Sequence, residues 1–122
     1  MIKIKENEVK KELGKFFTLT KETTEDLKMP GGIIDEYWHE MLKDTNRYSE
    51  FCEKYAGYYV IHVEAGGVDV LDWVKRYEKE YGKLNKLWFT DKNGFFKGSE
   101  YEEYEKTGIV KMSWDCKPKI VL

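Results

Sequence analysis

The chain has 122 residues and a net charge of −2, with 41% apolar and 16% aromatic residues. This length suits one domain, and the composition excludes a disordered chain. The near-zero charge argues against a general attraction to nucleic acid or anionic membranes, and no apolar run resembles a signal peptide or reaches the roughly 18 residues of a membrane helix. We therefore expect a single globular domain over residues 1–122, cytoplasmic, with neither nucleic acid nor membrane among its partners.

Helical periodicity dominates the first half of the chain. The expected helices cover residues 7–19, 33–42 and 45–56. Asn7 is a possible N-cap of the first helix, and Asp44 or Thr45 is the expected N-cap of the third. Trp38 and Phe51 lie centrally on the apolar stripes of consecutive helices, so we expect both side chains in one core.

The second half mixes strand and helix signals. The expected elements are a strand at 58–63, a helix from Asp69 to Gly82, a hairpin around 91–94, a helix at 100–106 and a strand at 109–114. Ala65-Gly66-Gly67 is expected to end the first strand, and Ser99 with Glu102 forms a capping-box pattern. The predicted fold class is α+β and mainly α: a small helical bundle with a short β-hairpin or a small antiparallel sheet.

Two histidines limit the acid–base chemistry that is available to the chain. Asp35 lies one helical turn before His39, and both are expected on the polar side of their helix, as an oriented imidazole or as a plain surface pair. The default role of His62 is structural, within a strand. A helical hairpin followed by a returning strand could nevertheless bring His62 near His39, and Asp35, His39 and His62 would then make a possible three-ligand metal site; the sequence leaves open whether the two histidines converge.

The cysteines weaken the case for a metal. His39, Cys52, His62 and Cys116 suit zinc by count, but their spacing contains no short chelating pair. Cys52 lies in the apolar stripe of its helix and is expected to be a small buried hydrophobe. Because neither cysteine is expected to complete a ligand shell, the sequence predicts no metal, no other cofactor and no stoichiometric zinc in the purified protein.

An ordered series of residues in the middle of the chain carries a family resemblance. The series is Asp35-Glu36-Tyr37-Trp38-His39, Asp44-Thr45-Asn46-Arg47-Tyr48, Phe51-Cys52, Gly57 and His62. It resembles the domain of unknown function found in plant glycine-rich domain-containing proteins and small bacterial relatives, whose pattern reads D-x-x-W-H, D-T-x-x-Y, F-C, G and H.

The resemblance implies a mostly helical domain with the Trp-His and Asp-Thr segments at a helix–helix junction, and it implies no reaction. Relatives often have a second histidine where this chain has Met41, and a His-His pair where it has Ile61-His62. Any metal or acid–base site of the family would therefore be depleted here.

The sequence contains no complete catalytic constellation, so we assign no catalytic residues. It favours a non-enzymatic binding or regulatory domain that acts through a protein partner, such as a small bacterial or phage inhibitor or accessory protein. The candidate binding residues are Asp35, His39, Asp44, Thr45 and His62. The alternative is a metal-dependent or acid–base enzyme site built on Asp35, His39 and His62. Two histidines in one polar pocket favour this alternative, whereas a separation above about 10 Å favours the binding domain.

Overall fold

The computed structural model describes residues 3–120, and the side chains of residues 6–120. Helices and one small antiparallel sheet form the fold, which confirms the α+β, mainly α class. The elements in chain order are α1 (Lys3–Leu19), β1 (Met29–Pro30), α2 (Ile33–Met41), α3 (Thr45–Tyr55), β2 (Ile61–Val70), α4 (Trp73–Tyr81), the 3-10 helix η1 (Lys86–Phe89), α5 (Gly98–Thr107) and β3 (Lys111–Lys119). Within these residues, no helix has the length and apolar character needed to cross a bilayer.

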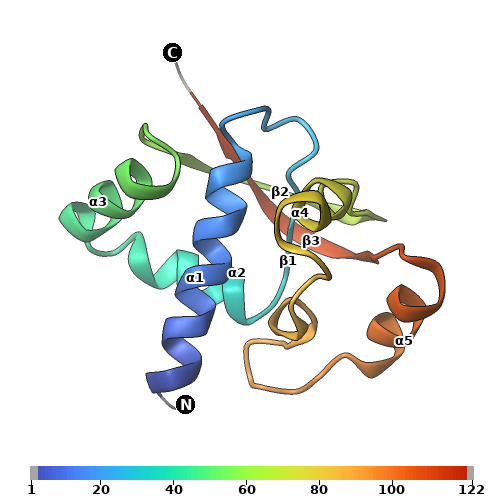
Figure 1. Ribbon diagram of the computed structural model, residues 1–122. Helices are drawn as coiled ribbons and strands as arrows, with labels where there is room; N and C mark the ends of the chain where they lie inside the picture. The colour runs from blue at the N-terminus through green and yellow to red at the C-terminus, as the bar shows by residue number, and fades with distance from the viewer. Residues whose placement is uncertain (1–2, 121–122) are drawn as a thin grey trace.

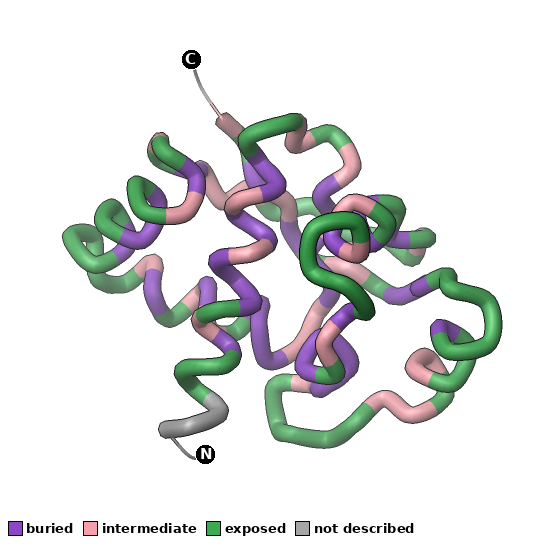
Figure 2. The backbone as a smooth tube through the Cα atoms, viewed as in Figure 1, coloured by how far each residue is buried: buried purple, intermediate pink, exposed green. Residues whose placement is uncertain are grey.

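Helix α1 runs through the middle of the molecule and carries much of the core (Figure 1). It contacts α2, α3 and α4, and its Phe16 and Phe17 side chains are fully buried. Buried stretches gather along α1 and the segments that face it, while the outer turns are exposed (Figure 2). Trp38 and Phe51 are buried in this same core, as predicted.

The sheet has the order β1-β3-β2, so the last strand in the sequence lies in the centre. Both neighbours pair with β3 in antiparallel orientation. Strand β2 continues to Val70, beyond the expected end at residues 65–67, because β3 supplies a partner along this length. A register shift between Glu64 and Gly67 accommodates the glycines as an irregularity within the strand. Asp69 therefore lies in β2 and does not cap α4.

Other boundaries also differ from the sequence prediction. Helix α1 begins before Asn7, so Asn7 is not its N-cap. Residues 87–89 belong to η1 instead of a strand, and the expected hairpin is reduced to one bridge between Thr90 and Phe96. Helix α5 begins at Gly98, which places Ser99 inside the helix, where its hydroxyl donates to Glu100 and forms no capping box. The Ser99 hydroxyl is therefore paired with its neighbour Glu100 and does not cap the start of α5.

Candidate functional site

Four side chains with metal-ligand chemistry converge where α2 packs against the sheet. Asp35 and His39 come from α2, His62 from β2 and Cys116 from β3. One ligand atom of each residue lies within 4.8 Å of the others. The Nε2 atoms of His39 and His62 are 2.9 Å apart. The structure thus brings together the two histidines, whose convergence the sequence left open, and we call these four residues the His-Asp-Cys cluster.

The turn between β1 and α2 sets the position of this cluster. The Gly31 amide donates to the Ser113 carbonyl of β3 at 3.4 Å, and the Ile33 amide donates to the Thr90 carbonyl at 3.0 Å. A Cβ atom on Gly32 would lie 2.7 Å from the Thr90 carbonyl oxygen, so a side chain here would force the backbone apart. Close backbone packing therefore holds the start of α2 against β3.

This packing corrects the expected environment of Asp35. The sequence placed Asp35 on the polar side of its helix, but β3 covers that side and leaves the residue only 6% exposed. The Cys116 thiol donates to Asp35 Oδ1 at 3.1 Å, and His39 Nε2 lies 3.4 Å from the same oxygen. Asp35 is thus the buried centre of the cluster, while the His39 side chain remains 40% exposed.

Burial shifts the proton affinities of the cluster. It raises the pKa of the Asp35 carboxyl group, against the opposing hydrogen bond from Cys116. Burial also lowers the pKa of His62, and the neighbouring His39 lowers it further. The Cys116 thiol has a raised pKa because it is buried and bonded to Asp35. Each shift disfavours the charged form, as expected for titratable groups removed from water.

The two cysteines have different roles. Cys52 is buried in the core and its sulfur accepts a 3.4 Å hydrogen bond from the Val60 amide, in agreement with the predicted structural role. Cys116 lies in the cluster, so the expectation that neither cysteine was well placed is wrong. A strand-like alternation could have shown that the last strand continues past the expected end at residue 114 and places Cys116 on its inner side. In β3 the buried positions are Met112, Cys116 and Pro118.

The other two candidate binding residues lie apart from the cluster. Asp44 and Thr45 are exposed at the start of α3. The Asp44 carboxylate accepts a hydrogen bond of 3.1 Å from the Arg47 amide, which is the contact expected of an N-cap. The structure thus gives Asp44 a local role in starting the helix.

A cleft of about 380 Å³ borders the cluster. Asp35 and His39 line it from α2, and Asp115 lines it from β3. Asp91 and Lys92 also line it, from the segment after η1. A molecule in this cleft would therefore meet the cluster at Asp35 and His39.

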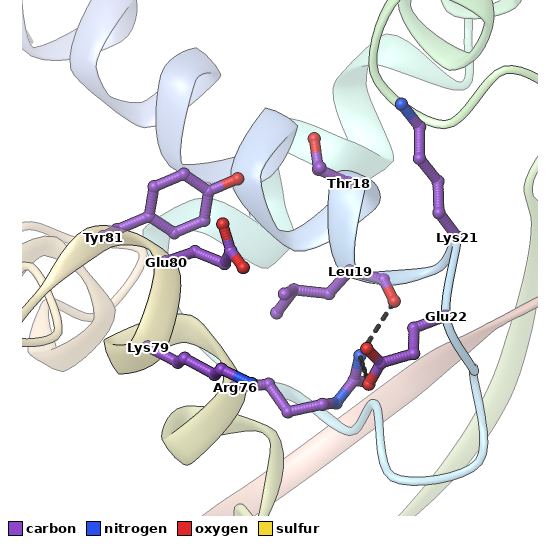
Figure 3. A pocket seen from close by; sticks show the side chains of 8 residues that line it. All are labelled: Thr18, Leu19, Lys21, Glu22, Arg76, Lys79, Glu80 and Tyr81. Carbon is purple, nitrogen blue, oxygen red and sulfur yellow. Dashed lines mark hydrogen bonds and ion pairs between the residues drawn. The ribbon is translucent and has the colours of Figure 1, made fainter.

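A second hollow, of about 370 Å³, lies between the end of α1 and α4 (Figure 3). Its central cation, Arg76, is already engaged. The guanidinium donates to Asp26 through two nitrogens and to the Leu19 carbonyl at 2.9 Å. Arg76 thereby ties the connection after α1 to α4, and we assign this hollow a structural role.

Three of the six separations between ligand atoms of the cluster are close to those of a tetrahedral zinc site, and the other three are at most 4.8 Å. With zinc–nitrogen bonds near 2.0 Å and zinc–sulfur bonds near 2.3 Å, ligand atoms of one tetrahedron lie about 3.3–3.6 Å apart. The His39–His62, Asp35–His39 and Asp35–Cys116 separations are 2.9, 3.4 and 3.1 Å. Shifts of about 1 Å or less in these three pairs would create room for the ion. Without an ion, the 2.9 Å contact allows a proton to pass between the two imidazoles.

Comparisons with known proteins identify a family and no function. No curated protein and no solved structure matches the chain. The resemblance to plant glycine-rich domain-containing proteins remains a prediction. The model of the UCP032817-like family matches residues 2–88, a range that contains Asp35, His39 and His62. Since the match covers well over half of the sequence, the chain belongs to the UCP032817-like family.

Proposed function

We propose that this domain binds one divalent transition-metal ion, with zinc as the first candidate, through His39, His62, Cys116 and Asp35. The observation that supports it is the convergence of four ligand atoms within 4.8 Å. The sequence predicted no metal because its spacing contains no short chelating pair, because Met41 stands where relatives often have a histidine, and because neither cysteine was expected to complete the ligand shell. The position of Cys116 removes the last of these reasons, so we replace the earlier expectation by this proposal.

The chemistry of the donors favours zinc over magnesium or calcium. Two imidazoles and a thiolate are nitrogen and sulfur ligands, which zinc accepts readily, whereas magnesium and calcium prefer oxygen. The lowered pKa of His62 keeps its imidazole neutral, the form that binds metal. The Cys116 thiol must lose its proton on binding, so affinity should rise with pH.

The number of ligands that bind decides what the ion does. With all four bound, the site is closed and the ion stabilises the junction of α2, β2 and β3. With Asp35 released, an open coordination position would face the cleft that Asp35 and His39 line. The second arrangement corresponds to the metal-dependent enzyme site of the alternative prediction, since a water molecule then has access to the ion.

Elemental analysis tests the metal directly. The chain should be purified without a metal-affinity tag, dialysed against zinc and then against buffer, and measured for zinc per chain. We expect about one zinc per chain in the original protein and a loss of zinc in His39→Ala and His62→Ala. Cobalt substitution adds a second readout, because a cobalt–thiolate absorption band should vanish in Cys116→Ser.

Cys52→Ala is the matched control, since Cys52 is also buried but lies outside the cluster. It should retain the zinc and the cobalt–thiolate band. A protein that contains no zinc after dialysis, and whose thermal midpoint is unchanged by zinc or chelator, would contradict the proposal and restore the earlier prediction of no metal.

The second function that we propose is the binding of a protein partner in the cytoplasm. It is supported by large apolar side chains on the surface, above all Phe95, which is 70% exposed. Exposed aromatic residues are frequent energetic centres of protein interfaces. Affinity purification from the native cell should recover one protein in stoichiometric amount with the original chain and much less of it with Phe95→Ser. Recovery of no stoichiometric partner by either chain would contradict this function.

A further inference from the structure

The turn after η1 holds two exposed phenylalanines in an ordered frame. Phe95 is 70% exposed and Phe96 is 49% exposed. The Asp91 carboxylate accepts hydrogen bonds from the amides of Asn93 and Phe95, each 2.9 Å long. The Asp91 amide donates in turn to the Phe95 carbonyl at 2.8 Å. Hydrogen bonds within the turn therefore hold the Phe95 ring in place outside the core, while the Phe96 ring packs on Tyr101 at a centroid distance of 5.3 Å.

The same turn forms one wall of the cleft beside the His-Asp-Cys cluster. Asp91 and Lys92 line this cleft together with Asp35, Glu36 and Asp115. Four carboxyl groups thus share the cleft with one lysine. Among the side chains of residues 6–120, Glu36, Asp91 and Asp115 form no ion pair. The carboxylates of Glu36 and Asp115 are therefore available to a partner, whereas that of Asp91 also accepts the two amides of its own turn.

A neighbouring hollow repeats this combination of acidic and apolar groups. Its volume is about 440 Å³, and it shares Glu36 with the cleft. Val9 and Ile33 give it apolar walls, while Glu6 and Glu40 add carboxylates and Arg47 adds one cation. We call the two hollows and the turn with Phe95 the acidic–apolar surface. Its main residues are Val9, Ile33, Glu36, Asp91, Phe95 and Asp115.

We propose that the acidic–apolar surface binds a basic segment of a partner protein, in which apolar side chains alternate with or stand beside lysine or arginine. The proposal rests on the second proposed function and names the chemistry of the partner. Opposite charges attract such a segment to Glu36, Asp91 and Asp115, and Phe95 gives it an apolar anchor. Nucleic acid is disfavoured at this surface because its phosphates would meet the carboxylates.

Two synthetic octapeptides test this chemistry without knowledge of the natural partner. One alternates leucine with lysine and the other alternates leucine with glutamate, each with a fluorescent label. Binding is measured by anisotropy in the presence of chelator, so that the result does not depend on bound metal. We expect the lysine peptide to bind at least about tenfold more tightly than the glutamate peptide and to weaken with added salt.

Variants locate the binding to the surface. Phe95→Ser should weaken binding of the lysine peptide by about fivefold or more, which is the effect of losing an interface anchor. The double variant Glu36→Gln with Asp115→Asn should weaken it by a similar factor and reduce the salt dependence. Val68→Ser is the matched control, because Val68 is 63% exposed on β2 and lies outside this surface. It should bind as the original protein does.

Three outcomes would overturn the proposal: no binding of the lysine peptide, equal binding of both peptides, or unchanged binding by Phe95→Ser. These outcomes are separate from a failure of the second proposed function. A natural partner that is recovered equally by the original chain and by Phe95→Ser would preserve protein binding and reject this surface. If the original chain neither binds the lysine peptide nor recovers a partner, both the surface and the protein-binding function are rejected.

Discussion

Trp38 connects the hydrophobic core to the histidine pair. Its indole is fully buried and meets Phe17 of α1 edge to face, with ring centroids 5.3 Å apart. The indole N–H donates to the Tyr48 hydroxyl at 3.1 Å. The His62 ring packs on Trp38 as well, at a centroid distance of 4.8 Å. A single side chain thus holds α1, α3 and β2 around the site.

Removing this side chain should be costly. We expect Trp38→Ala to lower the free energy of unfolding by about 3–5 kcal/mol, because it leaves a cavity and removes the indole N–H that donates to the Tyr48 hydroxyl. Urea melts would measure the change. Tyr81→Ala is a control at an aromatic residue that is 39% exposed, and it should cost much less. A loss below about 1 kcal/mol for Trp38→Ala would contradict its central place in the core.

His62 should make the stability of the metal-free protein depend on pH. Burial and the nearby His39 lower its pKa below the ordinary value of 6.5. The unfolded chain therefore takes up this proton first as the pH falls through 6.5, and folding stability decreases. The raised pKa of Asp35 acts in the opposite direction, because its contribution to stability is lost as the pH rises.

Urea melts in chelator at pH 7.5 and 5.5 would separate these effects. We expect the original protein to be less stable at the lower pH, and we expect His62→Gln to lose a smaller part of its stability over the same interval. Asp35 is present in both proteins, so the comparison isolates the histidine. Equal losses in the two proteins would show that His62 does not govern this pH range.

At the scale of elements, the start of α3 shows how one residue determines a helix boundary. Asp44 has extended backbone angles, and its carboxylate accepts the Arg47 amide at 3.1 Å. Either Asp44 or Thr45 suited this position in the sequence, and the structure selects Asp44. In the same helix, the Tyr48 hydroxyl donates to the Val60 carbonyl and so ties α3 to the segment just before β2.

Asp44→Ala should therefore destabilise the protein by about 1 kcal/mol, the usual cost of losing an N-cap. Thr45→Ala is the matched control at the adjacent residue, which makes no cap contact, and it should change stability by no more than about 0.5 kcal/mol. Denaturant melts of both variants would decide the assignment. A larger effect at Thr45 than at Asp44 would reverse it.

At the scale of the whole molecule, β3 closes the fold and completes the cluster. It lies between β1 and β2, and Cys116 is opposite Met29 on one side and Glu64 on the other. The family match ends at residue 88, before this strand. The segment within the match contains three members of the cluster, and the segment beyond it supplies the fourth.

A fragment of residues 1–88 should therefore not fold by itself. It lacks the central strand and the buried side chains of Phe89, Val110, Met112 and Cys116. We expect no cooperative urea transition for this fragment by circular dichroism, whereas residues 1–120 should unfold cooperatively. A cooperative transition of the fragment at near-native stability would show that β3 is an addition to an already complete core.

The sequence by itself determined two helices of this protein, α2 and α3. The apolar stripes of α2 and α3, the burial of Trp38, Phe51 and Cys52, and the cap at the start of α3 follow from patterns within about four residues. The short connections also made the approach of His62 to His39 possible, because a helical hairpin and a returning strand can bring them together, but the sequence left their convergence open. These inferences depend on neighbours along the chain.

Tertiary structure alone decided the sheet and the composition of the site. The extent of β2 and its irregularity at Gly67 depend on pairing with β3. At this point Gly67 pairs with Trp114, which lies more than 40 residues further along the chain. Asp35 is polar and lies on a helix, yet β3 buries it against Cys116. Strand pairing joins residues at large sequence separation, so local periodicity cannot reveal which side of a helix a distant strand will cover.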